Sequence, residues 1–504
     1  MTEKIRVSKE TKIFINEVAE LYKSGEKFAF FVGAGISIAD PAKLPGGNKL
    51  KHNLIDYMGE CNAHIYNHIK NEDKIYSLIN RIPLELLCSI ITDMTNDYII
   101  PEFMKQNLST NIFNNSHISL ALLCAVGFCS FIITPNFDTL IEEAFTKVLS
   151  NVKLNVSIFH DLMTNKKAGG MEAITLIKVH GCITDNSSIV ATLDKVGKGF
   201  NDAQAKVLNT IFENYCVIVV GWSDNDYDLT PFFIETPKPI FWIDHLGMCK
   251  KLNQISSIVN PDSKRYLEID SEKFWKVLCS VCNIPEITVV IDPSHQKDLL
   301  GDSWGGGEME SLYAAFAWVL FAIGDLENSL FFFQKSKHWI DNKIGPYAAP
   351  DILYRYSLVS FLLNRMQLSH DCFHQALKQY ESLKNINLYL GLTLCSYLLD
   401  MLDKDSSHSD QLEKVVAEKD PEKLKFLNAL KMMKSKDHRF REMISRDLLN
   451  SGFFLEACIV SDTDLLNRIA ERFDYRIITF PELQRAQAYV NYSLWQAEVK
   501  NAGI

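Results

Sequence analysis

An apolar segment that runs directly into a glycine loop constrains the fold of this chain more than any other feature. Phe28–Val32 is apolar throughout, and the loop Gly33–Ser37 (Gly-Ala-Gly-Ile-Ser) follows it without a break. Continuous apolarity is typical of a strand that is buried on both faces, as in a parallel sheet between layers of helices. Glycine suits a tight turn after such a strand with or without a bound phosphate, so the loop alone leaves both interpretations open.

Four further apolar runs also have polar residues or glycine directly behind them. These are Phe128–Ile133 before Thr134–Asp138, Ile174–Ile177 before Lys178–Gly181, Cys216–Val220 before Gly221–Ser223, and Ile240–Ile243 before Asp244. In a doubly wound parallel sheet, ligands bind outside the carboxyl ends of the strands. We therefore expect an α/β fold with a Rossmann-like parallel sheet, and we expect these loops to converge on one ligand site.

Taken together, these loops resemble the signature of the sirtuin (silent information regulator 2) family. That signature has a Gly-Ala-Gly-Ile-Ser loop, a Thr-x-Asn-x-Asp loop and a His-Gly pair, found here at Gly33–Ser37, Thr134–Asp138 and His180–Gly181. The stretch Gly221–Ser223, with Asp226 behind it, is similar to the family's later loop against the adenosine ribose. The resemblance covers about residues 25–245 and implies that the chain binds NAD.

The resemblance assigns catalytic roles to three residues. Asn136 would orient the nicotinamide ribose or the attacking water, Asp138 would hold the nicotinamide amide or order its own loop, and His180 would act as general base. The residues leave a second interpretation open, because Asn and Asp are common N-caps and a helix is expected from Thr139. A histidine before glycine also occurs as a structural residue. His117, at the start of an apolar helical pattern, is interpreted as a helix-start or packing residue.

The same resemblance assigns the nucleotide-binding residues. Backbone N–H groups of the glycine loop would hold the pyrophosphate, aided by a helix N-terminus behind the loop. The adenosine half would lie along the loop that follows Cys216–Val220, and the residue after Ile240–Ile243 would reach a ribose hydroxyl. The residues concerned are Gly33, Ala34, Gly35, Ser37, Thr134, Gly221, Ser223, Asp226 and Asp244.

The cysteine pattern departs from the deacylating sirtuins, which hold a structural zinc with two Cys-x-x-Cys pairs between the His-Gly pair and the later glycine loop. The stretch Ile183–Tyr215 contains no cysteine, and the one Cys-x-x-Cys, Cys279–Cys282, lies in the helical pattern Lys273–Val281. We interpret its cysteines as core residues and predict no metal site. Asp40–Gly47 stands where the family usually has an Arg closely behind the glycine loop. This pattern resembles the zinc-free sirtuin-like domains of bacterial antiphage defence proteins, which destroy NAD.

The sequence therefore predicts an NAD glycohydrolase (NAD⁺ nucleosidase) that uses NAD as its substrate, releases nicotinamide and ADP-ribose, and needs no metal. By the resemblance, it depletes cellular NAD in antiphage defence (abortive infection) once an unknown phage-derived or nucleotide activator is present. Two alternatives remain open. One is an NAD-dependent protein deacylase or ADP-ribosyltransferase, of which deacylation is disfavoured by the missing zinc cysteines. The other is a non-catalytic nucleotide-sensing module, which has no use for a base such as His180.

Charge and hydropathy disfavour some classes of partner. A net charge of −10 argues against nonspecific nucleic-acid binding, which needs a basic face. No apolar run approaches the roughly 20 residues of a membrane span, and the N-terminus lacks the apolar core of a signal peptide. The 12 cysteines lie mostly in apolar stretches, as reduced thiols do, so we expect a cytoplasmic protein.

The character of the chain changes near residue 295. We expect a sirtuin-like NAD-binding domain over residues 1–295, with a helical insert at about 49–111 that caps the nucleotide crevice, and a helical domain over 296–504. Ala317–Ser336 resembles a tetratricopeptide-type helix pair, with a generic helical bundle as the alternative. Because an NAD hydrolase needs an off state, we expect the helical domain to regulate it through a homo-oligomer or a partner protein.

Overall fold

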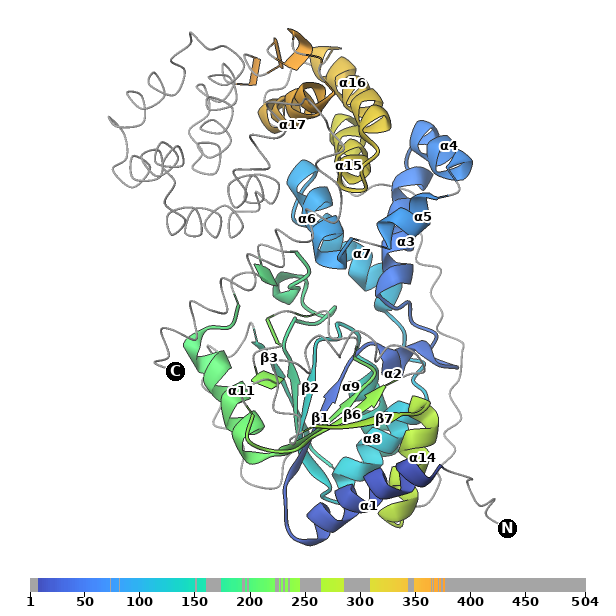
Figure 1. Ribbon diagram of the computed structural model, residues 1–504, viewed down its shortest axis with the longest axis vertical. Helices are drawn as coiled ribbons and strands as arrows, with labels where there is room; N and C mark the ends of the chain where they lie inside the picture. The colour runs from blue at the N-terminus through green and yellow to red at the C-terminus, as the bar shows by residue number, and fades with distance from the viewer. Residues whose placement is uncertain are drawn as a thin grey trace. The chain divides into compact units, whose positions relative to one another are not determined.

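The chain divides into two compact units (Figure 1). We call residues 1–50, 101–190 and 199–301 the sheet unit, and residues 51–100, 191–198 and 302–504 the helical unit. All the predicted site residues belong to the sheet unit. The computed structural model describes residues 8–149 except 73 and 81, 152–159, 174–192, 195–196, 199–222, 226, 228–229, 232–233, 236–244, 264–284, 309–342, and 349–376 except 364, 366, 370 and 373–374.

One parallel sheet forms the centre of the sheet unit. Its seven described strands lie in the order β3-β4-β2-β1-β5-β6-β7, and each neighbouring pair is parallel. The strands are β1 (Phe28–Val32), β2 (Cys129–Thr134), β3 (Leu154–Ile158), β4 (Ile174–Lys178), β5 (Cys216–Val220), β6 (Ile240–Asp244) and β7 (Lys264–Glu268). The chain starts at β1 and adds β2 to β4 on one side and β5 to β7 on the other. The predicted α/β fold is confirmed, and its switch point lies between β1 and β5, where such sheets bind ligands.

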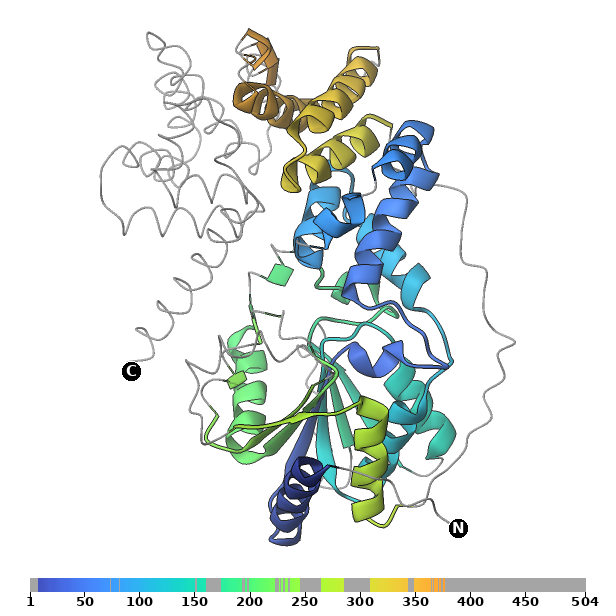
Figure 2. The same ribbon diagram turned by 45° about the vertical axis from the view of Figure 1, so that its right-hand side comes forward.

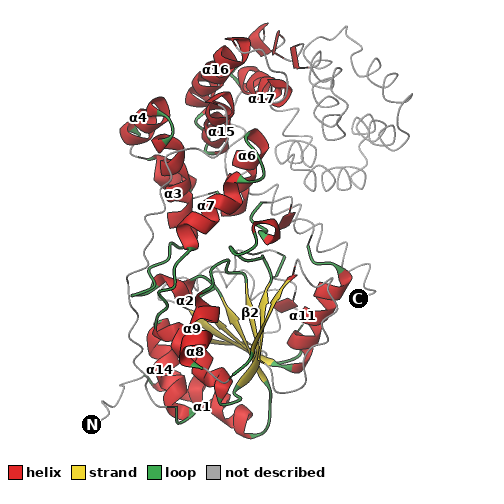
Figure 3. Ribbon diagram, turned by 180° about the vertical axis from the view of Figure 1, so that it is seen from behind, coloured by secondary structure: helices red, strands yellow, loops and turns green. Residues whose placement is uncertain are grey.

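Helices cover both faces of this sheet (Figures 1 and 3). One face packs against α1 (Lys9–Lys23), α8 (Asn115–Ala125), α9 (Leu140–Val148) and α14 (Ser271–Val281), and the other against α11 (Asp202–Asn214). Within β1, Phe28, Phe30 and Val32 belong to the first core, whereas Ala29 and Phe31 belong to the second. All five side chains are buried. A strand with apolar contacts on both faces has a continuous apolar sequence, as predicted.

The two edge strands, β3 and β7, were not predicted from the sequence. The five predicted strands are the inner strands β1, β2, β4, β5 and β6. At the edges, residues of β3 are only partly buried and Val156 is 46% exposed, while β7 has the sequence Lys-Arg-Tyr-Leu-Glu. An edge strand has a neighbour on one side only, so its sequence does not show the continuous apolar run that marks the inner strands.

The insert predicted at 49–111 is helical, as expected. It comprises α3 (Gly47–Glu60), α4 (Ala63–Asn71), α5 (Ile75–Ile79), α6 (Leu84–Met94) and α7 (Ile99–Leu108). Within the helical unit, α6 packs against α15 (Met309–Ala322), so residues from the insert and from the C-terminal region share one unit. The predicted position of the insert over the nucleotide crevice stays a prediction.

The predicted helix pair at Ala317–Ser336 is confirmed by α15 and α16 (Leu326–Asn342), which pack on each other and are followed by α17 (Ala349–Leu362) (Figure 2). Gly324, with φ of +85°, ends the first helix. The Oγ of Ser329 donates to the carbonyl of Ala317 and the Oγ of Ser336 donates to that of Glu310, each at 2.7 Å. The tetratricopeptide assignment stays a prediction, because residues 377–504 lie outside the described residues.

Candidate active site

The predicted site residues follow neighbouring strands at one edge of the sheet. Across the sheet, His180 lies two residues after β4, Asn136 two residues after β2, the glycine loop directly after β1, and Gly221 directly after β5. Parallel neighbours end at the same edge, so the structure groups these four positions as expected. Asp244 is the last residue of β6, paired with Glu268, and its side chain lies outside the description. Ser223 also lies outside the described residues.

Close packing between two loops accounts for three of the glycines. A Cβ on Gly33 would lie 2.6 Å from the carbonyl oxygen of Gly221, and one on Gly35 would lie 2.6 Å from the Cα of Gly221. Gly221 itself has φ of +70°, which favours glycine. The N–H groups of Gly33 and Gly35 donate to the carbonyls of Val220 (3.0 Å) and Gly221 (2.8 Å). These glycines therefore join the loops after β1 and β5 directly.

The same loop offers fewer N–H groups to a phosphate than its sequence suggests. The N–H of Ser37 donates to the carbonyl of Ala34 at 3.0 Å, so Gly33, Gly35 and Ser37 all have protein acceptors. The helix behind the loop, α2 (Gly35–Ile38), is a single turn. Ala34 is exposed at the start of this turn. Binding a pyrophosphate through the three engaged N–H groups would require the loop to rearrange.

The hydroxyl of Ser37 connects two buried residues from other elements. Its Oγ lies 3.2 Å from Nε2 of His117 and donates to Oδ2 of Asp138 at 3.3 Å. Burial lowers the pKa of His117 to about 4, and the nearby charge of Asp138 opposes this only in part. His117 is therefore neutral at physiological pH. The side chain of Ser37 thus holds protein groups together at the base of the site.

The prediction that His117 begins a helix is confirmed by a capping box at the start of α8. The Oδ1 of Asn114 accepts from the N–H groups of Ser116 (3.0 Å) and His117 (3.4 Å), and the N–H of Asn114 donates to Nδ1 of His117 at 3.3 Å. The Nδ2 of Asn114 also donates to the carbonyl of Ile36 at 2.7 Å. The cap therefore ties α8 to the glycine loop, a role of Asn114 that the sequence analysis missed.

The loop that carries Asn136 is hydrogen-bonded on several sides. The Oγ1 of Thr134 donates to the carbonyl of Val32 at 2.7 Å and accepts from the N–H of Asn136 at 3.1 Å. The Oδ1 of Asp138 accepts from the N–H of Leu140 at 3.0 Å, so this carboxylate caps α9, as the capping interpretation predicted. Asn136 differs from its neighbours. It is 7% exposed, and its Nδ2 has no hydrogen-bond partner among the described residues.

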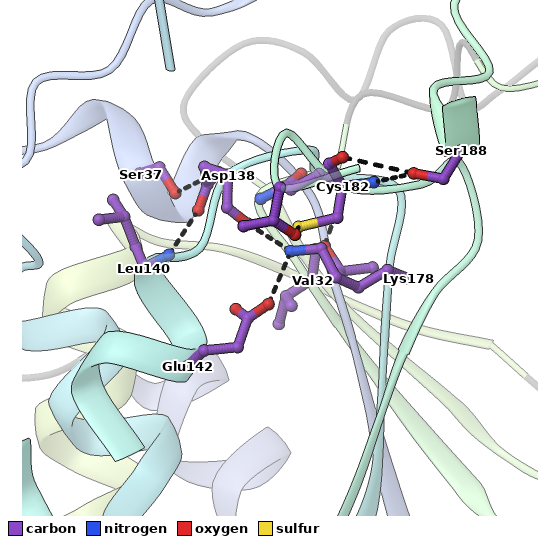
Figure 4. A network of polar contacts seen from close by, with 11 residues as sticks. Val32, Ser37, Asp138, Leu140, Glu142, Lys178, Cys182 and Ser188 are labelled. Carbon is purple, nitrogen blue, oxygen red and sulfur yellow. Dashed lines mark hydrogen bonds and ion pairs between the residues drawn. The ribbon is translucent and has the colours of Figure 1, made fainter. Parts of the chain in front are cut away.

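Lys178, the last residue of β4, is a buried charged residue that the sequence analysis did not select. Its ammonium group donates to the carbonyl of Asp138 and lies 3.1 Å from Oε1 of Glu142 (Figure 4). Burial acts to lower its pKa, but Glu142, Cys182 and Asp138 outweigh that effect and raise it. The available signal was the position of this lysine between the apolar run Ile174–Ile177 and Val179, because charged side chains are seldom found within a buried apolar segment.

His180 lies between two carboxylates from the loop after β5. Its Nε2 lies 3.0 Å from Oδ2 of Asp228, and its Nδ1 lies 3.7 Å from Oδ1 of Asp226. The other oxygen of Asp226 accepts from Nε1 of Trp222. Burial raises the pKa of Asp226, while His180 and Trp222 act in the opposite direction. The prediction placed Asp226 along the adenosine half, but its described contacts are with His180 and Trp222.

The two carboxylates reach His180 across other strand ends. In the sheet, β1 and β2 lie between β5 and β4, so Asp226 and Asp228, which follow β5, contact a residue that follows a strand two places beyond its neighbour. Asp228 was not predicted as a site residue from the sequence. Its spacing from Asp226, in Asp-Asn-Asp-Tyr-Asp, gave no reason to prefer it over its neighbours.

A comparison with protein families bears on this arrangement. Residues 130–233 match the SIR2-like domain family. The matched stretch contains Asn136, Asp138, His180 and Asp226, and it begins after the glycine loop. The match implies NAD binding and suggests an enzyme that uses NAD. Among curated proteins, no match to the chain was found.

The two cysteines of the Cys-x-x-Cys pair lie in or against the core of the sheet unit. Cys279 is buried in α14, and Cys282 packs against the same core just after that helix, both as free thiols. No group of three or more His, Cys, Asp or Glu side chains that could hold a metal ion occurs in the described part of the chain. The absence of a metal stays a prediction. Among the described helices, none is long and apolar enough to cross a membrane.

Proposed function

We propose that the protein is an NAD glycohydrolase that converts NAD and water to nicotinamide and ADP-ribose. The observation that carries this proposal is the side chain of Asn136. Its amide nitrogen is buried without a partner in the described residues, at the end of a strand that neighbours β1 and β4. A buried donor without a partner is costly. A ribose hydroxyl or a bound water would satisfy it, which fits a substrate such as NAD.

Cleavage of NAD does not require a strong general acid from the protein. Nicotinamide is cationic in NAD, so it leaves with the electron pair of the C–N bond as a neutral molecule, and the ribose carbon becomes oxocarbenium-like. Water then adds to that carbon and loses a proton. In this proposal Asn136 orients the ribose or the water, and His180 accepts the proton. Asp138 orders the Asn136 loop, since both of its carboxylate oxygens already accept hydrogen bonds.

The nucleotide half of NAD would bind at the ends of β1, β2, β5 and β6. Ala34 is the exposed residue of the glycine loop, and Gly221 faces that loop. We assign the pyrophosphate and adenosine contacts to this edge of the sheet, with the glycine loop adjusting as NAD binds. The residues proposed for it are Gly33, Ala34, Gly35, Ser37, Thr134, Gly221, Ser223, Asp226 and Asp244.

Chromatography of NAD incubated with the protein tests the proposal. The protein is assayed in lysates of phage-infected and uninfected cells, with and without an acylated peptide. We expect nicotinamide and ADP-ribose in equal amounts from infected lysate without any peptide. NAD loss only with the peptide would favour a deacylase, ADP-ribose attached to protein would favour a transferase, and saturable binding without cleavage would favour a nucleotide sensor. Stoichiometric zinc by elemental analysis would also count against the hydrolase.

In the cell, we propose that the enzyme is a cytoplasmic antiphage effector whose activity is held off until infection. The helical unit is the candidate regulator, acting through self-association or a protein partner. The packing of α6 on α15 supports this role, because it lets the C-terminal region act on the insert within one unit. A chain ending near residue 294 lacks α15. We expect it to differ from the full chain in NAD cleavage, oligomeric state or response to the activator.

A further inference from the structure

Lys178 is an unexpected residue for its position. It lies at the end of an inner strand with 0% of its surface exposed, between the buried residues Ile177 and Val179. Burying a charge is unfavourable unless partners compensate, and an apolar residue of similar volume is often at least as stable. A methionine or leucine here would continue the core of β4. The presence of lysine therefore indicates a role for its charged hydrogen-bond donor, which an apolar side chain lacks.

The partners of Lys178 lie on the Asn136 loop and on the helix behind it. Its ammonium group donates to the carbonyl of Asp138, two residues after Asn136, and pairs with Glu142 on α9 (Figure 4). In the chain, Lys178 is also two residues before His180. One buried side chain therefore connects the strand that leads into the proposed base with the loop that carries the proposed ribose contact.

Two main-chain hydrogen bonds also fix the segment that follows β4 against the Asn136 loop. The N–H of Val179 donates to the carbonyl of Thr134, and the N–H of Ile183 donates to the carbonyl of Phe137, each at 3.0 Å. On the far side, the hydroxyl of Ser37 holds the carboxylate of Asp138. In this surrounding, the amide nitrogen of Asn136 is the donor left without a partner among the described residues. These contacts therefore fix the loop around this unpartnered donor.

We propose that Lys178 is a positioning residue for NAD cleavage, which fixes the Asn136 loop relative to His180 through the carbonyl of Asp138. This inference rests on the proposed function. Lys178 itself touches no substrate. Small displacements of a reacting group cost large factors in rate, so loss of this contact should lower kcat while leaving the binding of the nucleotide half intact.

A double-mutant cycle on the full chain, under the activating condition, tests this role. We expect Lys178→Met to lower kcat on the order of 10-fold to 100-fold and to leave KM for NAD within about twofold. In an Asn136→Ala background, Lys178→Met should cause almost no further loss, because the group that it positions is gone. Affinity for ADP, measured by calorimetry, should be unchanged in Lys178→Met. Lys178→Met/Glu142→Leu removes both charges and serves if the single variant is unstable.

Thr236→Val is the control, because Thr236 is also buried, its Oγ1 also donates to a main-chain carbonyl, that of Phe212, and it precedes β6 at the end of that strand opposite the proposed site. It should keep the wild-type kcat. The inference is overturned if Lys178→Met lowers kcat by the same factor with and without Asn136, if it has no effect, or if Thr236→Val causes an equal loss. A separate result bears on the proposed function. If Asn136→Ala cleaves NAD at the wild-type rate, the proposed site itself is wrong.

Discussion

The Asn136 loop and the surroundings of His180 hold their proposed functional groups by different means. Around Asn136, the contacts are made mostly by main-chain groups and hydroxyls, and Lys178 donates to a main-chain carbonyl. Around His180, the contacts are made by the carboxylates of Asp226 and Asp228.

The position of Asn136 therefore depends on hydrogen-bond geometry, whereas the state of His180 depends on the charge of its neighbours. Main-chain and hydroxyl groups keep their hydrogen bonds across the physiological pH range, so the position of Asn136 should not depend on pH. The protonation of a histidine between carboxylates depends on their negative charge, which favours the charged ring. Variants on the Asn136 side should therefore change the size of the activity, and variants on the His180 side should also change its pH dependence.

The largest expected effect comes from removing either proposed catalytic side chain. Asn136→Ala and His180→Ala should each lower NAD cleavage on the order of 100-fold or more, as is typical for loss of a positioned general base or ribose contact. Circular dichroism and thermal unfolding should show an intact fold. The residual activity of Asn136→Ala should keep the wild-type pH profile. Near-normal turnover in either variant would contradict the assignment.

Asn136→Asp sharpens this test, because it keeps the shape of the side chain but replaces the amide donor by a carboxylate oxygen. If the buried Nδ2 is the group that matters, this variant should lose nearly as much activity as Asn136→Ala. Retained activity would show that the donor is not needed.

The next effect concerns stability in acid and depends on His117. Burial holds its pKa near 4, against 6.5 in the unfolded chain, so the unfolded chain binds the proton first as pH falls. The stability that depends on neutral His117 is complete above pH 6.5 and is lost as pH falls toward 4. The wild type should therefore lose about 2 kcal/mol from this residue between pH 7 and pH 5.

Urea unfolding at the two pH values measures this loss, with His117→Gln as the comparison. Glutamine keeps a donor and an acceptor but does not titrate, so the variant should lose less stability on acidification than the wild type. An equal loss in both proteins would mean that His117 does not titrate as its burial implies.

A smaller effect on activity is expected for Asp228→Asn. The amide can still accept from Nε2 of His180, but it no longer carries a charge beside the ring. We expect NAD cleavage to fall on the order of tenfold, with the acidic limb of the pH–activity profile moved to lower pH. Asn136→Ala should not move that limb. If the pH–activity profile of Asp228→Asn is not shifted, the proposal that variants around His180 change the pH dependence of activity is wrong.

The smallest effect is expected for Asp226→Asn. Burial raises the pKa of Asp226, so its contribution to stability is complete below the unfolded pKa and is lost as pH rises through the folded pKa. At pH 7 the buried charge is destabilising, and asparagine should raise the free energy of unfolding by roughly 1 kcal/mol. Asn can still accept from Trp222. In unfolding experiments the gain should shrink as pH falls toward 4, and a gain that is constant with pH would contradict this account.

The inner strands, the loops behind them and the helix start at His117 could be predicted from the sequence because their causes are local. A strand between two layers of helices needs apolar residues throughout, as in Phe28–Val32, and a parallel sheet ends all such strands at one edge. Asn114 and His117 form their capping box within one turn of chain. The positions of Asn136 and His180 at strand ends follow from the same patterns.

Only the tertiary structure decided which residues hold the site together. Gly33 and Gly35 meet Gly221, and Lys178 meets the carbonyl of Asp138, although these partners are far apart in the chain. Asp228 reaches His180 past the ends of two other strands. Such contacts depend on strand order and loop path, which no local pattern encodes. The sequence alone therefore does not show whether a glycine or an aspartate faces a ligand, a backbone group or a histidine.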